Sequence, residues 1–92
     1  DLASAALFLM LNYNEKEIIN VGTGDEISIN DLAIKILKNL DFNCSIVFDN
    51  TKPDGTPRKL LDSSKIKKLG WKHSISIDEG IEMTIKENLK AF

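Results

Sequence analysis

The chain has 92 residues, of which 42% are hydrophobic and 28% charged, and its formal net charge is -2. This length allows one small domain, and the slightly acidic balance gives no general attraction to nucleic acid or to an anionic membrane. The longest apolar runs fall short of the ~20 residues that a membrane-spanning helix needs. We therefore expect no nucleic-acid partner and no membrane partner, so any bound anion must be held by a local cluster of cations.

Cys44 is the only cysteine, so the chain can form no intrachain disulfide and no metal site of the paired-cysteine type. A single thiol fits a reducing compartment, and we expect a cytoplasmic protein. The sequence begins at Asp1 without a methionine or a signal-like apolar stretch. We therefore expect residues 1–92 to form one domain cut from a longer protein.

The first predicted element is a helix over residues 1–13, where apolar side chains recur at helical spacing and Asp1 can cap the first turn. Residues 17–22, EIINVG, follow a polar turn. They are rich in Ile and Val and end at Gly22, which predicts a short strand.

A second helix is predicted from Ser28, whose hydroxyl can accept a hydrogen bond from the Asp31 amide while Asp31 answers it, as in a capping box. Six apolar residues then form a stripe that we expect to be buried: Ile29, Leu32, Ala33, Ile36, Leu37 and Leu40. Residues 44–48, CSIVF, predict a second strand. Strand, helix and strand in this order favour a parallel pair with a right-handed crossover.

Two further helices are predicted in the last third of the chain. Asp62 can cap the segment 63–69, and Gly70 is the expected left-handed end. Trp71 follows as an apolar plug. The final helix begins with a Ser-x-x-Glu signature and continues at helical spacing through Ile77, Ile81, Met83, Ile85 and Leu89. The expected fold class is α/β, a small domain with short parallel strands and about four helices.

Gly22 and Gly24 stand between a predicted strand and a predicted helix, as glycines do in nucleotide-binding turns. A dinucleotide fingerprint needs a third glycine three residues further on, and Ile27 stands there. The helix is also predicted to start only at about Ser28. We therefore interpret the GTG stretch as a turn that ends a strand.

The other candidates form no catalytic arrangement. His73, the only histidine, lies in a polar connection and is interpreted as a surface residue. Tyr13 has Lys16 three residues later and Glu17 four residues later, so a Tyr-x-x-x-Lys pair is absent. Because no nucleophile has a recognisable base, we expect no catalytic, cofactor-binding or metal-binding residue in this chain.

The segment KPDGTPRKLLD, residues 52–62, combines two prolines, a glycine and three cations. Its Pro-Asp-Gly is turn chemistry and its Thr-Pro extends the chain, so Arg58 and Lys59 project from a stiff backbone. A guanidinium fork and a mobile ammonium suit a diphosphate, and Asp54 can accept hydrogen bonds from sugar or ribose hydroxyls. The alternative is that Asp54 caps its own turn while the cations face solvent. Charge and spacing leave both interpretations open.

Three stretches resemble the C-terminal part of the GDP-L-fucose synthases, a branch of the extended short-chain dehydrogenase/reductase family: NVGTGDEISINDLA, IVFDNTKPDGTPRKLLDSSKIKKLGW and SIDEGI. The resemblance covers essentially the whole chain, and its most specific element is KPDGTPRKLLD followed by LGW. The related UDP-sugar 4-epimerases usually carry an Arg-x-Gly-Asp pattern in this loop, which is absent here.

The resemblance implies a smaller substrate-binding domain, attached in the family to an N-terminal Rossmann domain that lies outside this chain. That other domain would bind NADP(H), supply the catalytic residues and form a homodimer, so Cys44 is not matched to the family's catalytic cysteine. Within this chain, Lys59 is the best candidate for a pyrophosphate contact, with Arg58 supporting it. Asp54 is the candidate for a hydroxyl contact, and Lys52 is a weaker candidate that can also simply face solvent.

The function implied is the GDP-sugar-binding part of an NADPH-dependent enzyme that epimerises and reduces GDP-4-keto-6-deoxy-mannose to GDP-L-fucose. The chain alone is expected to be inactive. Two alternatives stay open. One is a part of another nucleotide-sugar epimerase or dehydratase, and the other is a non-enzymatic α/β module that binds a partner through the exposed face of its first helix, residues 3–10.

Overall fold

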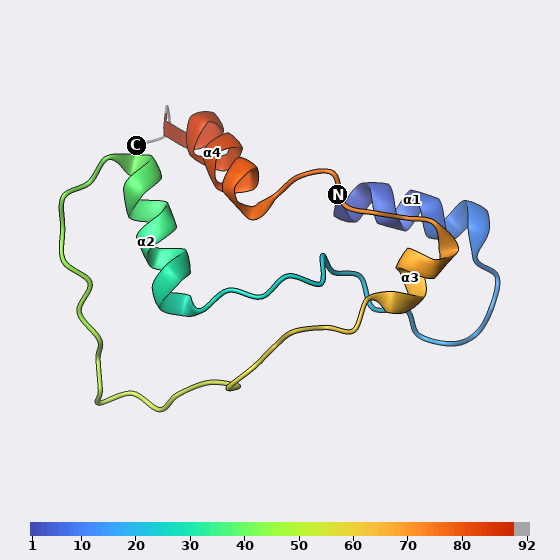
Figure 1. Cartoon of the computed structure of the whole chain (residues 1–92), viewed down its shortest axis with the longest axis horizontal. Coiled ribbons are helices and arrows are strands. Elements are labelled where there is room, and N and C mark those ends of the chain that lie inside the picture. The colour runs from blue at the N-terminus through green and yellow to red at the C-terminus, as the bar shows by residue number, and fades with distance from the viewer. Residues whose placement is uncertain (90–92) are drawn as a thin grey trace. The chain divides into compact units, whose positions relative to one another are not determined.

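The computed structural model describes residues 1–89 and contains four helices in that range. In chain order these are α1 (Leu2–Asn12), α2 (Ile29–Leu40), α3 (Ser64–Leu69) and α4 (Ile77–Asn88), as labelled in Figure 1. Within the described residues, no helix has the length and apolar character needed to cross a bilayer. All four helices that were predicted from the sequence are present.

The chain divides into two compact units. The first unit comprises Asp1–Glu26 and Lys59–Ile75 and contains α1 and α3. The second unit comprises Ile27–Arg58 and the chain from Ser76 onward and contains α2 and α4. Each unit is thus built from two stretches that lie far apart in the sequence.

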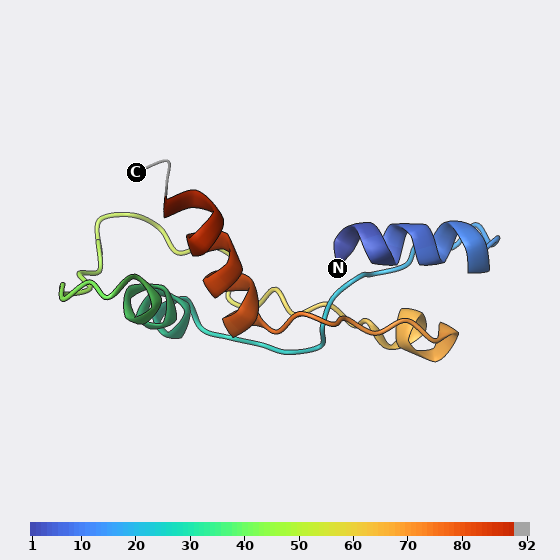
Figure 2. The same cartoon turned by 90° about the horizontal axis from the view of Figure 1, so that it is seen from above.

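The core of the first unit is formed by residues of α1, of α3 and of the segment that follows α3, and α1 and α3 lie side by side in Figures 1 and 2. Ala5 and Ile66 are fully buried, and Trp71 is 7% exposed. Partly buried apolar residues pack around them: Phe8, Leu9, Ile19 and Val21. The prediction of Trp71 as an apolar plug is confirmed. Gly70 ends α3 with a φ of 111°, the left-handed conformation that was predicted for it.

The start of α1 is tied to the segment after Trp71. Asp1 stands at the N-cap position, but its carboxylate makes no capping bond to α1. Instead, Oδ1 accepts hydrogen bonds from the amide and the hydroxyl of Ser74, each at 3.0 Å, and Oδ2 accepts one from the Ile75 amide at 3.0 Å. The predicted capping role of the Asp1 side chain is therefore wrong, because three donors from residues 74 and 75 occupy the carboxylate.

In the second unit, α2 packs against α4. The ammonium of Lys35 on α2 lies 2.6 Å from Oδ1 of Asp78 on α4. The hydroxyl of Ser28 accepts the predicted bond from the Asp31 amide at 3.0 Å, but among the described residues the reciprocal bond to the Asp31 carboxylate is not formed, so the predicted capping box is only half present. At the start of α4 both bonds of the capping box between Ser76 and Glu79 are formed.

The apolar stripe of α2 is less buried than expected. Ile29 is 79% exposed and Ile36 is 37% exposed, and no residue of α2 is fully buried. The four other residues of the stripe, Leu32, Ala33, Leu37 and Leu40, are half-buried. The expectation of a buried stripe is wrong, since the packing of α2 against α4 leaves Ile29 and Ile36 exposed.

Neither predicted strand is formed in the described part of the chain. Residues 17–22 and 44–48 are irregular. A strand persists only where its backbone N–H and C=O groups pair with a neighbouring strand. The first segment belongs to the first unit and the second to the second unit, so neither unit contains two candidate strands. The described chain is therefore helical with long irregular connections, and the predicted parallel pair is wrong.

Candidate substrate-binding site

The loop that carries the predicted site, residues 52–62, is shared between the two units. Lys52, Asp54 and Arg58 belong to the second unit, whereas Lys59 begins the second stretch of the first unit. All four residues are exposed. Their joint role in binding a ligand remains a prediction.

The turn that leads into this loop is built by Asp49, which the sequence analysis did not single out. Its Oδ1 accepts hydrogen bonds from the Thr51 hydroxyl at 2.6 Å and from the Thr51 amide at 3.0 Å. These two bonds hold the pKa of Asp49 below its ordinary value, the hydroxyl bond having the larger effect. Asp-x-Thr is typical of a turn in which Asp bonds the backbone two residues on, and this spacing is the signal that could have identified it.

Asp54 has no such partner in the part of the chain that the structure describes: its carboxylate accepts no hydrogen bond there. The space beside Gly55 is also open, since a Cβ added to this glycine would meet no atom within 4 Å. The missing hydrogen bond argues against the interpretation that Asp54 caps its own turn. It also leaves the Asp54 oxygens available to the hydroxyl groups of a ligand.

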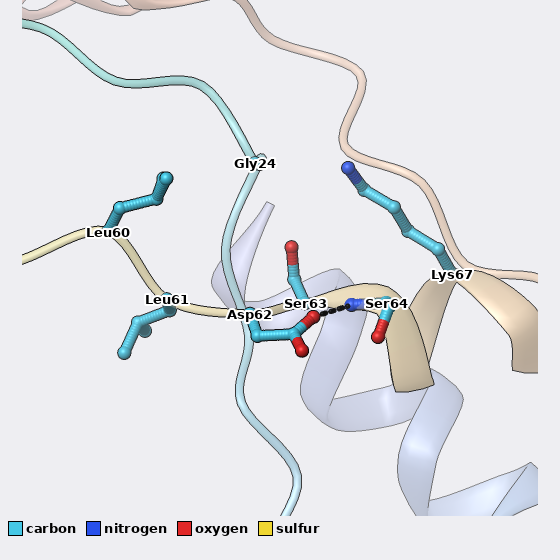
Figure 3. Close-up of a pocket in the computed structure, with 7 residues that line it drawn as sticks. All are labelled: Gly24, Leu60, Leu61, Asp62, Ser63, Ser64 and Lys67. Carbon is cyan, nitrogen blue, oxygen red and sulfur yellow. Dashed lines mark hydrogen bonds between the residues drawn. The ribbon is translucent and has the colours of Figure 1, made fainter.

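A pocket of about 440 Å³ lies in the first unit, immediately after Lys59 in the sequence. Figure 3 shows that it is bordered by the turn at Gly24 on one chain segment and by the approach to α3 on another. Its lining consists of Gly24, residues 60–64 and Lys67. None of the four residues predicted as the site is part of this lining.

Asp62 organises the side of the pocket that leads into α3. Its Oδ1 accepts a hydrogen bond from the Ser64 amide at 3.0 Å (Figure 3). This bond is the main reason that the pKa of Asp62 lies below its ordinary value. Asp62 was predicted to cap this helix, but the N-cap position belongs to Ser63, a buried residue whose side chain makes no capping bond. The prediction is right only in that the Asp62 carboxylate bonds the first amide of α3.

Lys67 and Gly24 meet at the other side of the pocket. Lys67 Nζ donates a hydrogen bond of 2.7 Å to the carbonyl oxygen of Thr23. Gly24 has a φ of 86°, and a Cβ at this position would lie 2.6 Å from Lys67 Nζ. The GTG stretch is therefore a turn, as predicted, but it ends no strand in the described part of the chain, and the ammonium of Lys67 occupies the space above it.

Tyr13 takes part in a structural cluster on the first unit. Its hydroxyl donates to the Glu17 carbonyl at 2.9 Å, and the Lys65 ammonium lies 5.4 Å from the centre of its ring. Lys65 also forms an ion pair with the Glu17 carboxylate. This pair lowers the pKa of Glu17 and raises the pKa of Lys65, in both cases mainly through the hydrogen bond between the two side chains.

His73 is half-buried, so its interpretation as a surface residue is only partly right. Its Nδ1 is buried without a hydrogen-bond partner among the described residues. Cys44 is exposed. Within residues 1–89, no group of three or more His, Cys, Asp or Glu side chains is placed to hold a metal ion.

Comparison with known proteins shows one consistent relationship, although no family model matches the chain. A protein named probable GDP-L-fucose synthase 1 from Oryza sativa subsp. japonica is 48% identical over 86 residues, which cover 94% of this chain and 26% of that protein. A GDP-L-fucose synthase from Escherichia coli (strain K12) is 50% identical over 66 residues, covering 72% of this chain and 21% of that protein.

This chain is homologous to one segment of the GDP-L-fucose synthases. It spans about a quarter of the length of these relatives. The crystal structure of a GDP-6-OMe-4-keto-L-xylo-heptose reductase from C. jejuni matches all of this chain and 29% of its own, with a TM-score of 0.89 and 34% identity. The chain therefore has the fold of one part of a sugar-nucleotide reductase, which bears out the resemblance to the GDP-L-fucose synthases.

The pocket and most of its lining were not predicted from the sequence. In particular, nothing in the sequence indicated that Gly24 and Lys67 lie together. Ser63 and Lys67 are four residues apart, so they share one face of α3. That spacing points to the side of α3 on which the pocket lies. The spacing does not reveal where the turn at residues 22–24 lies, because this turn is more than thirty residues away in the sequence.

Proposed function

We propose that this chain is the GDP-sugar-binding part of a GDP-L-fucose synthase, an enzyme that converts GDP-4-keto-6-deoxy-mannose to GDP-L-fucose with NADPH. The observation that carries the proposal is the identity of 48% to 50% with proteins of that name. The fold shared with a GDP-sugar reductase supports the same substrate class. Within the complete enzyme the chain supplies part of the substrate-binding site, and without the rest of the enzyme it is inactive.

Lys59 and Arg58 are the proposed contacts to the diphosphate, and Asp54 is the proposed contact to a hydroxyl group. All three residues are exposed on a loop stiffened by Pro53 and Pro57. A stiff loop loses less conformational entropy when a ligand binds, so more of the charge attraction appears as affinity. Lys52, next to the turn built by Asp49, is a weaker candidate for the same anion.

NADPH supplies the hydride for reduction at C4 of the sugar, and it is held by a domain outside this chain. The residues present here do not fit a dinucleotide cradle, because the space above the turn at Gly24 is taken by the Lys67 ammonium. We also propose a homodimer formed through that other domain and a cytoplasmic location, which the lone exposed thiol of Cys44 fits.

The test is an assay of the complete enzyme for NADPH oxidation with GDP-4-keto-6-deoxy-mannose, alone and with Lys59→Ala. A charge-assisted hydrogen bond contributes about 1.5–3 kcal/mol, so loss of the Lys59 ammonium should raise KM about tenfold or more. Lys72→Ala, at another exposed lysine of the first unit, is the matched control and should leave KM unchanged. Failure of the wild-type enzyme to oxidise NADPH with this substrate would contradict the proposed reaction.

A second candidate is the reduction of a different GDP-4-keto sugar, favoured by the structural match of this whole chain to 29% of the heptose reductase. The identity to that protein is 34%, against 48% and 50% for the two GDP-L-fucose synthases compared above, and this difference favours the first candidate. The two are separated by supplying both sugar nucleotides to the complete enzyme and comparing kcat/KM. A higher value for the heptose derivative would replace the first candidate by the second.

A further inference from the structure

Two stretches that are distant in the sequence, residues 20–24 and 59–67, are linked in the first unit by two hydrogen bonds. Asn20 Nδ2 donates to the Asp62 carbonyl at 3.5 Å, and Lys67 Nζ donates to the Thr23 carbonyl at 2.7 Å. The first bond is at the long limit of hydrogen-bond geometry, whereas the second is short and has a charged donor. The Lys67 bond is therefore the stronger of the two links.

The hydrogen bond between Lys67 and Thr23 depends on the presence of glycine at position 24. Gly24 adopts a left-handed φ of 86°, and a Cβ there would lie 2.6 Å from Lys67 Nζ, well inside van der Waals contact. The glycine thus allows both the backbone turn and the close approach of the ammonium. In Figure 3 the Lys67 side chain extends from α3 along the side of the pocket that faces this turn.

The segment held by this link leads directly to Lys59. The Asp62 carboxylate fastens residues 62–64 to the start of α3, and Lys67 fastens α3 to the turn at residues 22–24. Asp62 lies three positions after Lys59, with Leu60 and Leu61 between them, and three residue steps span at most about 10 Å. Fixing Asp62 therefore keeps the backbone of Lys59 within about 10 Å of Asp62.

We infer that Lys67 is a positioning residue for substrate binding, which acts by bracing the approach to α3 so that Lys59 is held where it meets the diphosphate. Lys67 itself does not touch the substrate. The inference rests on the proposed function, since it concerns the affinity for a GDP-sugar. We therefore expect substitution of Lys67 to change KM more than it changes kcat.

The experiment compares Lys67→Met and Lys67→Arg with the wild-type complete enzyme, using GDP-4-keto-6-deoxy-mannose and NADPH. Met keeps the aliphatic stem and removes the donor, and Arg restores a charged donor. We expect Lys67→Met to raise KM about fivefold with kcat within about twofold, as the loss of one charge-assisted bond acting indirectly would do. Lys67→Arg should recover most of the affinity. Lys72→Met is the matched control and should behave as wild type.

Amide hydrogen exchange of the same variants measures, without turnover, how firmly Lys67 holds the turn at residues 22–24 and the approach to α3. In Lys67→Met, amides in residues 20–26 and 59–64 should exchange faster, while those of α4 should not change. A KM within twofold of wild type, or a KM rise that Lys72→Met reproduces, would overturn the role of Lys67. Unchanged exchange at residues 20–26 would overturn it as well. Absence of turnover in the wild-type enzyme would instead contradict the proposed function, and the exchange experiment would still decide whether Lys67 braces the turn.

Discussion

The indole Nε1 of Trp71 donates a 3.2 Å hydrogen bond to the hydroxyl of Ser4, which lies 67 residues earlier in the chain. The bond joins the first turn of α1 to the residue that follows the end of α3. Trp71 also packs on Ala5 and Ile66 in the small core of the first unit. This core therefore forms only when the two ends of the first unit have come together.

Ile66→Ala should be strongly destabilising, because Ile66 is fully buried in a core with few members. Replacing a buried Ile by Ala leaves a cavity and costs about 2–5 kcal/mol. The free energy of unfolding in urea, measured on the complete protein, checks this value. Ile18→Ala is the control, since Ile18 is 89% exposed and surface substitutions usually change stability by less than about 0.5 kcal/mol. Equal effects of the two substitutions would contradict the core described here.

Gly24→Ala should destabilise the first unit, whereas Gly55→Ala should be close to neutral. At Gly24 the left-handed backbone alone costs an alanine about 1–2 kcal/mol, and the added Cβ would also collide with Lys67 Nζ. At Gly55 a Cβ would meet no atom within 4 Å.

The collision can be separated from the backbone strain with the double variant Gly24→Ala, Lys67→Ala. Removing the ammonium leaves the strain and abolishes the collision, so the two substitutions should be less costly together than the sum of each alone. Unfolding free energies for the four proteins of this cycle give the coupling. A strictly additive cycle would show that the ammonium does not lie against residue 24.

Asp62 should make the free energy of unfolding depend on pH in the acidic range. The Ser64 amide lowers the pKa of Asp62 in the folded state, so the folded protein binds this proton less tightly than the unfolded chain does. The resulting stabilisation is complete above the unfolded pKa of about 3.9 and is lost as the pH falls through the lower folded value. Asp62→Asn should therefore be less stable than wild type at pH 7, with a difference that narrows below about pH 4.

Urea titrations of wild type and Asp62→Asn at several pH values between 2 and 7 measure this difference. Asp54→Asn serves as the control, because the Asp54 carboxylate accepts no hydrogen bond among the described residues. A gap between wild type and Asp62→Asn that stays constant with pH would show that the Ser64 bond does not depend on the charge of Asp62.

Local signals in the sequence were sufficient for the helices and their ends. A capping residue and its partner lie within three positions of each other, so Ser76 with Glu79 and Ser28 with Asp31 can be recognised without knowledge of the fold. The left-handed stop at Gly70 is local in the same sense. The side chain of Asp1 was misjudged because its actual donors lie more than seventy residues away.

Features that need a distant partner could not be predicted in this way. Isoleucine-rich and valine-rich segments favour a strand, but a strand forms only beside another one, and residues 17–22 and 44–48 fall in different units. The pocket is a similar case, since Gly24 and Lys67 are brought together by the packing of the first unit. The exposed loop at residues 52–59 was predictable because its stiffness and charge are local, whereas its ligand was indicated only by resemblance.

The apolar character of α1 has a practical consequence for anyone who produces these residues. One side of the helix carries Ala5 in the core, yet the rest of its surface is also apolar, with Leu2, Leu7, Met10 and Leu11 more than half exposed. A helix that is apolar all round is stable in water only when it is covered on every side. Expressed without additional chain, residues 1–92 should recruit chaperones and aggregate at micromolar concentrations, so a solubilising fusion at the α1 end is the rational starting point.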